Sequence, residues 1–125
     1  MKILGIDYGS KRIGLAISDE TKTLARELTI IPYNKFFNEI KNIIEQNEIG
    51  EIAVGLPLNM DGVDSAKTQE VRGFADLLKS QTAIPVILVD ERLSTEMTKN
   101  LPGGEINKDS LAAQIILQNY LNKKK

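Results

Sequence analysis

Hydrophobic residues in the first 31 positions fall into three short runs that polar turns separate. The runs are Lys2 to Tyr8, Arg12 to Ser18 and Leu24 to Ile31, and the turns contain Gly9-Ser10-Lys11 and Asp19 to Lys22. Short apolar runs bounded by such residues are typical of β-strands. Because connections this short join antiparallel neighbours, we expect a three-stranded meander.

After Pro32 the hydrophobic period changes from about two residues to about 3.6. Two phenylalanines and three isoleucines between positions 36 and 44 fall on one face, with Lys and Glu opposite. This pattern predicts an amphipathic helix from Asn34 to about Asn47. Asn34 can serve as its N-cap.

The rest of the chain alternates strands and helices. The predicted elements are a strand at Glu51 to Leu56, a helix from about Asp64 to Gln81, a strand at Pro85 to Val89, a short helix that Ser94 caps and that ends near Asn100, and a helix that Asn107 caps and that ends near Asn122. Strands joined through helices require right-handed parallel crossovers. We therefore expect one α/β domain over residues 1–125, a five-stranded mixed sheet with helices on both faces, and foremost a ribonuclease H-like fold.

The 125-residue chain contains no Cys and no His. This excludes disulfides, Cys/His zinc sites, a cysteine nucleophile and a Ser-His-Asp triad. Any catalysis must use carboxylates, amines, hydroxyls or metal held by oxygen. The formal net charge of −1 excludes a wholly basic surface, although a local positive face is enough to bind nucleic acid.

The hydrophobic runs are also too short for a membrane protein. None approaches the roughly 20 residues that span a bilayer, and the N-terminal run turns polar too early for a signal peptide. We expect a cytoplasmic protein.

Asp7 ends the first strand, which is central in a ribonuclease H-like sheet and ends where α/β sheets bind ligands. Alternation places Asp7 on the same face as Ile3 and Gly5. An acid there costs desolvation unless it is paired or binds metal. A turn Asp that accepts N–H bonds around Gly9 would show the same pattern.

Asp90 and Glu91 end the fifth predicted strand. Because adjacent strand residues face opposite sides, only one of them can share a site with Asp7, and periodicity alone does not choose. A charged strand end would give the same sequence.

Asp109 lies in the first turn of the last helix, where any acid is favoured by the helix dipole. Ala112, Ala113 and Ile116 share its side of the helix, which indicates that Asp109 leans over the sheet. Clustered carboxylates repel unless a cation neutralises them, and a site of oxygen ligands suits Mg²⁺ or Mn²⁺. Two such ions can activate water and stabilise the leaving oxygen of a phosphodiester.

Candidate substrate-binding residues surround the same edge of the sheet. The first turn can present N–H groups and positive charge to phosphate, or it can be a solvated hairpin turn. Asn59 could contact sugar or phosphate, and Arg92 could clamp a phosphate. The full set is Gly9, Ser10, Lys11, Arg12, Asn59, Arg92 and Thr95.

Four blocks in this order resemble the YqgF family, also described as RuvX-type or Holliday junction resolvase-like. They are Gly5 to Gly14 (GIDYGSKRIG), Val54 to Pro57 (VGLP), Asp90 to Thr95 (DERLST), and Asp109 to Ala113 with Ile116 to Gln118. The similarity runs from about residue 2 to residue 121. It implies a ribonuclease H-like fold and a bacterial cytoplasmic nuclease that trims the 5′ end of precursor 16S rRNA; the older family description is a Holliday junction resolvase.

The resemblance also implies that the catalytic, metal-binding acids are Asp7, Glu91 and Asp109, with Asp90 a structural neighbour. It matches Arg12 and Arg92 to basic residues of the family. The implied partner is precursor ribosomal RNA, with DNA junctions as a second possibility, and the chain is expected to be a monomer or a weak homodimer.

The chain departs from the family pattern in the stretch from Glu96 to Lys108, where family members often carry many basic residues. Here the basic residues are Lys99 and Lys108 alone. Fewer phosphate contacts reduce affinity and its salt dependence. A partner protein or the ribosome precursor could supply the missing grip. Two rival hypotheses follow: a dimer that resolves DNA junctions, and a non-catalytic adaptor that binds nucleic acid or protein.

Overall fold

The computed structural model describes residues 1–58, 65–90 and 108–123, with the side chains of residues 108–110 left out. Five strands form one sheet in the order β3-β2-β1-β4-β5. The strands are β1 (Lys2–Asp7), β2 (Arg12–Ser18), β3 (Ala25–Pro32), β4 (Ile49–Leu56) and β5 (Val86–Asp90). β1 and β2 pair antiparallel, as do β2 and β3, whereas β4 is parallel to both β1 and β5. The predicted mixed sheet with a central first strand is confirmed.

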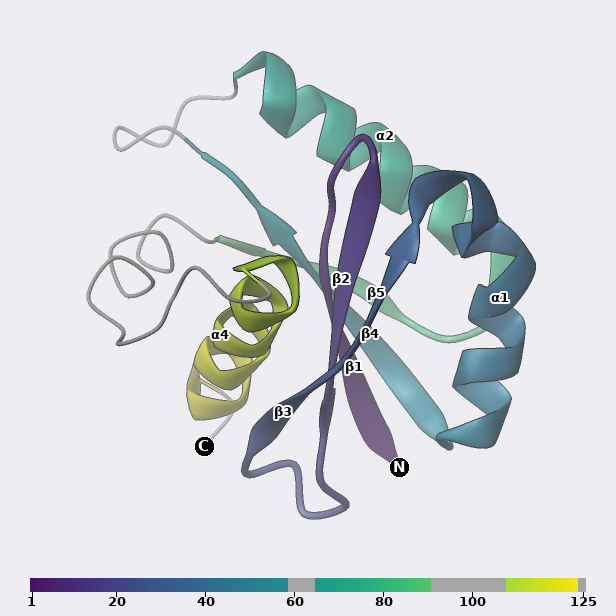
Figure 1. Cartoon of the computed structure of the whole chain (residues 1–125). Coiled ribbons are helices and arrows are strands. Elements are labelled where there is room, and N and C mark those ends of the chain that lie inside the picture. Colours follow the sequence, from purple (N-terminus) through teal and green to yellow (C-terminus); the bar gives the residue numbers. More distant parts are fainter. Residues whose placement is uncertain (59–64, 91–107, 124–125) are drawn as a thin grey trace.

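Helices cover both faces of the sheet, as predicted (Figure 1). Apolar residues of α1 (Tyr33–Gln46) and α2 (Ala66–Gln81) pack against one face in the larger of two hydrophobic clusters. α4 (Lys108–Lys123) packs against the other face in a smaller cluster built mainly from Ala, Ile, Leu and Val. The first face therefore has a thick aromatic layer and the second a thin layer of smaller side chains.

Two helix starts differ from the prediction. Asn34 is not the N-cap of α1, because the helix begins at Tyr33, directly after Pro32, and no side chain caps it. The Tyr33 N–H instead donates to the Lys11 carbonyl at 2.9 Å, which fixes the helix start from the β1–β2 turn. α2 begins at Ala66 with Ser65 as its cap. The predicted short helix from Ser94 and the cap at Asn107 lie outside the described residues.

α4 approaches the middle of the sheet so closely that a side chain at Gly5 would not fit. A Cβ on Gly5 would lie 2.7 Å from the Leu117 Cβ and 3.2 Å from the Ala113 carbonyl oxygen. Ala113, Ile116 and Leu117 are fully buried, as expected for the face toward the sheet. Ala112, predicted to share that face, is half-buried and therefore lies at its margin.

Two glutamine side chains hold α4 to the start of β3. Gln118 accepts the Ala25 N–H at 2.9 Å and donates to the Thr23 carbonyl at 3.0 Å, while Gln114 donates to the Ala25 carbonyl at 3.1 Å. The turn that presents these groups is itself held by Asp19, which accepts the Thr23 N–H at 2.8 Å. That bond holds the pKa of Asp19 below its usual value. The glutamine amides fix where α4 lies along the sheet.

We predict opposite effects for alanine at two glycines. Gly5→Ala overpacks the contact with α4 and should lower the free energy of unfolding by about 1–3 kcal/mol. Gly73→Ala, in α2, adds a Cβ that has no atom within 4 Å apart from its chain neighbours and the backbone of its own helix. It should raise the free energy of unfolding by roughly 0.5–1 kcal/mol because Ala favours helix. Urea denaturation measures both. A Gly5→Ala variant as stable as wild type would contradict the close packing.

Replacement of Gln118 should destabilise the fold through lost hydrogen bonds. Gln118→Leu leaves the Ala25 N–H and Thr23 carbonyl without this partner, which should cost about 1–3 kcal/mol. Gln69→Leu, at an exposed glutamine of α2, is the matched control and should change stability by no more than roughly 0.5 kcal/mol. Equal unfolding midpoints for the two variants would show that the glutamine contacts do not hold α4.

Candidate active site

Asp7 lies at the edge where β1, β3, β4 and β5 all end, here called the carboxyl edge. It is the last residue of β1 and is half-buried. Leu4 and Ile6 belong to the cluster under α1 and α2, whereas Ile3 belongs to the cluster under α4. Because side chains alternate along a strand, Asp7 faces the α4 side, as predicted.

The direction of α4 brings its first turn to the same edge. The Tyr120 hydroxyl donates to the Glu51 carboxylate, and Glu51 pairs with Ile3 near the start of β1. Ala113 and Leu117 lie over Gly5, further along β1. α4 therefore runs antiparallel to β1, and Asp109, one turn before Ala113, lies in the part of α4 nearest the carboxyl edge (Figure 1).

The packing of β5 shows which face Asp90 is on. Val89 packs in the cluster under α4 and Leu88 packs against the opposite cluster. Asp90 therefore faces away from α4 and does not share the face of Asp7. Glu91, the next residue along the chain, lies outside the described residues.

Glycines flank Asp7 on the α4 face. Asp7 pairs with Gly14 of β2, and on β4 the register Ile6–Val54 continues to Gly55, which pairs with Val89. Neighbouring positions in register share a face, so the strand positions on both sides of the carboxylate carry no side chain. No side chain from these two positions therefore crowds the Asp7 carboxylate, and carboxylate oxygen is a ligand that suits a hard divalent ion.

The β1–β2 turn places four of the predicted binding residues at this edge. A Cβ on Gly9 would overlap the Arg12 carbonyl oxygen, so the tight turn requires glycine. Ser10, Lys11 and Arg12 are exposed. The remaining predicted binding residues, Asn59, Arg92 and Thr95, lie outside the described residues.

Tyr8 anchors the end of β1 from the opposite face, a role that the sequence did not indicate. Its ring centroid lies 4.8 Å from that of Phe74 and 6.0 Å from that of Tyr33. Lys67 lies over the ring, with its Nζ 5.1 Å from the centroid. Burial, and next the charge of Glu70, which also accepts the Tyr8 hydroxyl, raise the pKa of Tyr8 above 10.0. Asp7 and Tyr8 are thus held on opposite faces.

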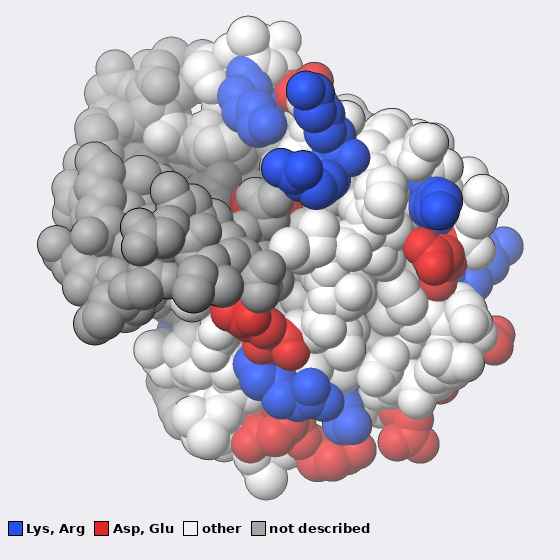
Figure 2. All heavy atoms as spheres, in the orientation of Figure 1, with Lys and Arg blue, Asp and Glu red and all other residues white. Residues whose placement is uncertain are grey.

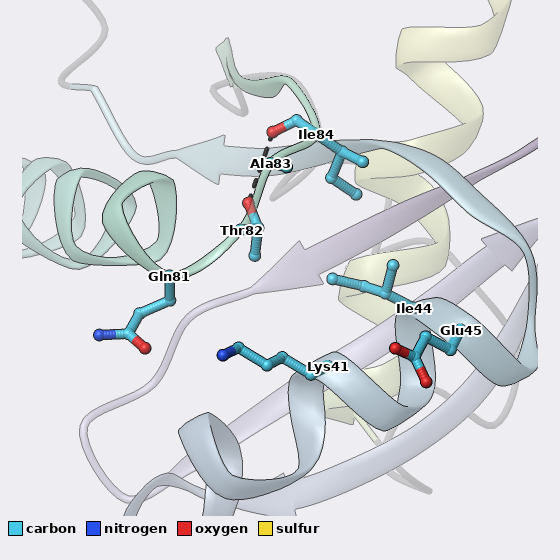
Figure 3. A pocket seen from close by; sticks show the side chains of 7 residues that line it. All are labelled: Lys41, Ile44, Glu45, Gln81, Thr82, Ala83 and Ile84. Carbon is cyan, nitrogen blue, oxygen red and sulfur yellow. Dashed lines mark hydrogen bonds between the residues drawn. The ribbon is translucent and has the colours of Figure 1, made fainter.

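A hollow of about 350 Å³ lies far from this site. It is lined by the second half of α1 and the segment from α2 to β5, where the Thr82 hydroxyl donates to the Ile84 carbonyl at 3.4 Å (Figure 3). β5 begins there and ends at Asp90. The hollow therefore lies at the edge opposite to Asp7, and its lining of Lys41, Glu45 and apolar side chains offers no group of metal ligands.

The metal prediction stays a prediction. Within residues 1–58, 65–90 and 111–123, no three acidic side chains gather closely enough to hold a metal ion. Two of the three predicted ligands, Glu91 and the side chain of Asp109, lie outside those ranges. In the same part of the chain, no helix is long and apolar enough to cross a bilayer.

Known structures share the fold. The RuvC of Thermus thermophilus in complex with a Holliday junction substrate superposes with a TM-score of 0.65 at 14% identity, covering 99% of this chain and 96% of that one. The fowlpox virus Holliday junction resolvase gives a TM-score of 0.56 at 13% identity, covering 98% and 99%. These likenesses confirm the predicted ribonuclease H-like fold.

Sequence comparisons show the family. A protein of Thermoanaerobacter pseudethanolicus named "Putative pre-16S rRNA nuclease" is 43% identical, covering 100% of this chain and 99% of that protein. One of the same name from Maridesulfovibrio salexigens is 40% identical, covering 97% and 98%. The family model described as "RuvX: Holliday junction resolvase" matches residues 1–123. The chain therefore belongs to the RuvX family.

Proposed function

We propose that this protein is a divalent-metal-dependent endonuclease that trims the 5′ end of precursor 16S rRNA. The observation that carries the proposal is the half-buried Asp7 on the α4 face, at the edge to which α4 returns the residue Asp109. The relatives named for pre-16S rRNA cleavage support the choice of substrate.

Asp7, Glu91 and Asp109 are the proposed catalytic and metal-binding acids. Glu91 follows the last residue of β5, and because Asp90 faces away from α4, strand alternation favours Glu91 as the acid on the side of Asp7. Bound divalent cations would supply activation of the attacking water and stabilisation of the leaving oxygen. Mg²⁺ or Mn²⁺ suits a set of carboxylate ligands.

The surrounding residues bind and orient the scissile phosphate. The exposed Lys11 and Arg12 can pair with the phosphate oxygens on either side of it, and Ser10 can donate a hydroxyl hydrogen bond. Arg92, Thr95 and Asn59 are proposed to extend this contact. Hydrolysis then adds water across one P–O bond, so the phosphorus gains a hydroxyl and the leaving oxygen gains a proton.

A DNA four-way junction is the second candidate substrate, favoured by the description of the family that the chain matches. Symmetric cleavage of a junction requires two active sites related by a two-fold axis. A chain that stays monomeric both in solution and on junction DNA would count against this substrate.

We expect loss of cleavage on removal of the acids that face α4. With a 5′-extended 16S rRNA transcript and Mg²⁺ or Mn²⁺, Asp7→Asn and Glu91→Gln should each slow cleavage at least about 100-fold, as loss of a positioned catalytic group does. Asp90→Asn is the matched control, an adjacent acid on the other face, and should cleave within a few-fold of wild type. Gel analysis of the 5′ ends gives the rates.

Two results would contradict the proposal. Equal cleavage by wild type, Asp7→Asn and Glu91→Gln would show that these acids are not catalytic. Binding of RNA by wild type without any cleavage, whether or not metal is added, would instead support the adaptor hypothesis.

A further inference from the structure

Positive side chains of the described residues gather at the carboxyl edge although the whole chain carries a net charge of −1. Lys11 and Arg12 lie in the β1–β2 turn, Lys35 in the first turn of α1 and Lys67 in the first turn of α2, and all four are exposed. Neither of these helices has an acidic residue in its first turn. In Figure 2, Lys and Arg gather at the top of the view, where Figure 1 shows the start of α2 and the β1–β2 turn.

Lys67 is held in position by two neighbouring side chains, Tyr8 and Glu70. Its Nζ lies 5.1 Å from the centroid of the Tyr8 ring and 4.0 Å from Glu70 Oε2. Tyr8 is packed against Phe74 and Tyr33, and its hydroxyl hydrogen bonds to Glu70. The ammonium group is therefore held beside the residue that follows Asp7.

The start of α2 is itself fixed to the end of β4. The Thr68 N–H donates to the Ser65 hydroxyl at 3.2 Å, and the Ser65 N–H donates to the Thr68 hydroxyl at 3.0 Å. Thr68, which is fully buried, also donates its hydroxyl to the Pro57 carbonyl. Lys67 thus projects from a rigid helix start next to the carboxyl edge.

A simple surface pair with Glu70 would be the alternative explanation for Lys67. Exposed pairs three residues apart on a helix contribute little to stability. Both side chains are 47% exposed and their separation of 4.0 Å is at the limit of an ion pair. Because nearly half of the Lys67 side chain is exposed, its ammonium stays accessible to an additional anion.

We propose that Lys67, positioned by Tyr8 and Glu70, binds a phosphate of the RNA backbone on the α2 side of the carboxyl edge. The RNA strand would then pass from Asp7 over the β1–β2 turn to the start of α2. This inference rests on the proposed function, since it assumes a polyanionic substrate at that edge. It also supplies phosphate contacts beyond the segment from Glu96 to Lys108, which carries few cations.

The test measures binding rather than cleavage. The Kd of a fluorescent 5′-extended 16S rRNA fragment is measured in EDTA over a range of KCl concentrations for wild type, Lys67→Ala, Lys67→Arg and Lys79→Ala. Lys79→Ala is the matched control, because it removes the same charge from the last turn of the same helix, at the opposite edge.

Loss of one phosphate contact should reduce the slope of log K against log[salt] by about 0.7–0.9 and weaken binding several-fold. We expect this for Lys67→Ala but not for Lys67→Arg or Lys79→Ala. Equal slopes for Lys67→Ala and wild type, or equal losses at Lys67 and Lys79, would overturn the inference while leaving the cleavage proposal intact. Failure of wild type to bind the RNA at all would overturn both.

Glu70→Gln separates the charge of Lys67 from the residue that positions it. This variant keeps the Lys67 ammonium, so the slope of log K against log[salt] should stay closer to that of wild type than in Lys67→Ala. Equal losses of slope in Glu70→Gln and Lys67→Ala would contradict the assignment of the phosphate contact to Lys67.

Discussion

The close approach of α4 to β1 is the constraint on which the site depends. At Gly5 the helix occupies the volume that a side chain would need, and Ala16 and Ala53 beside it are also small and buried. The amide contacts of Gln118 and Gln114 then fix the helix along the sheet. Because the helix runs antiparallel to β1, its position on the sheet determines how near its first turn comes to Asp7.

The two faces of the sheet have different roles at the carboxyl edge. The face under α1 and α2 is filled by aromatic rings that hold Tyr8 and, through it, the end of the central strand. On the other face, the positions beside the carboxylate of Asp7 are Gly14 and, by continuation of the register, Gly55, which carry no side chain. The end of β1 therefore packs against aromatic rings on one face and lies between glycines on the other.

Local patterning accounts for most of the fold. The change of hydrophobic period at Pro32 predicted where strands give way to helix, and alternation along Lys2–Asp7 predicted the face of Asp7. The predicted start of α1 was wrong because a hydrogen bond from the Tyr33 N–H to the Lys11 carbonyl sets it. No local pattern reveals this bond. The contacts of Gln118 could not be predicted either, because a polar residue in a helix is usually interpreted as solvent-exposed.

The face on which a site residue lies could be predicted only where apolar and polar residues alternate along its strand. In β5 every residue before Asp90 is apolar, so its sequence carries no alternation, and only the packing of Val89 under α4 shows which way Asp90 faces. The family resemblance points to Glu91 independently of that packing. Lys67 could not be found from the sequence because its significance depends on Tyr8, which is distant in the chain and close in space.

We propose that Asp7, Glu91 and Asp109 meet on the α4 face to hold divalent metal. Diffraction from crystals of the wild-type protein soaked in Mn²⁺ locates the ion through its anomalous signal. We expect Mn²⁺ bound by the carboxylates of all three acids, with Asp90 turned to the other face. Mn²⁺ bound elsewhere, or at Asp7 without Glu91 and Asp109, would contradict it.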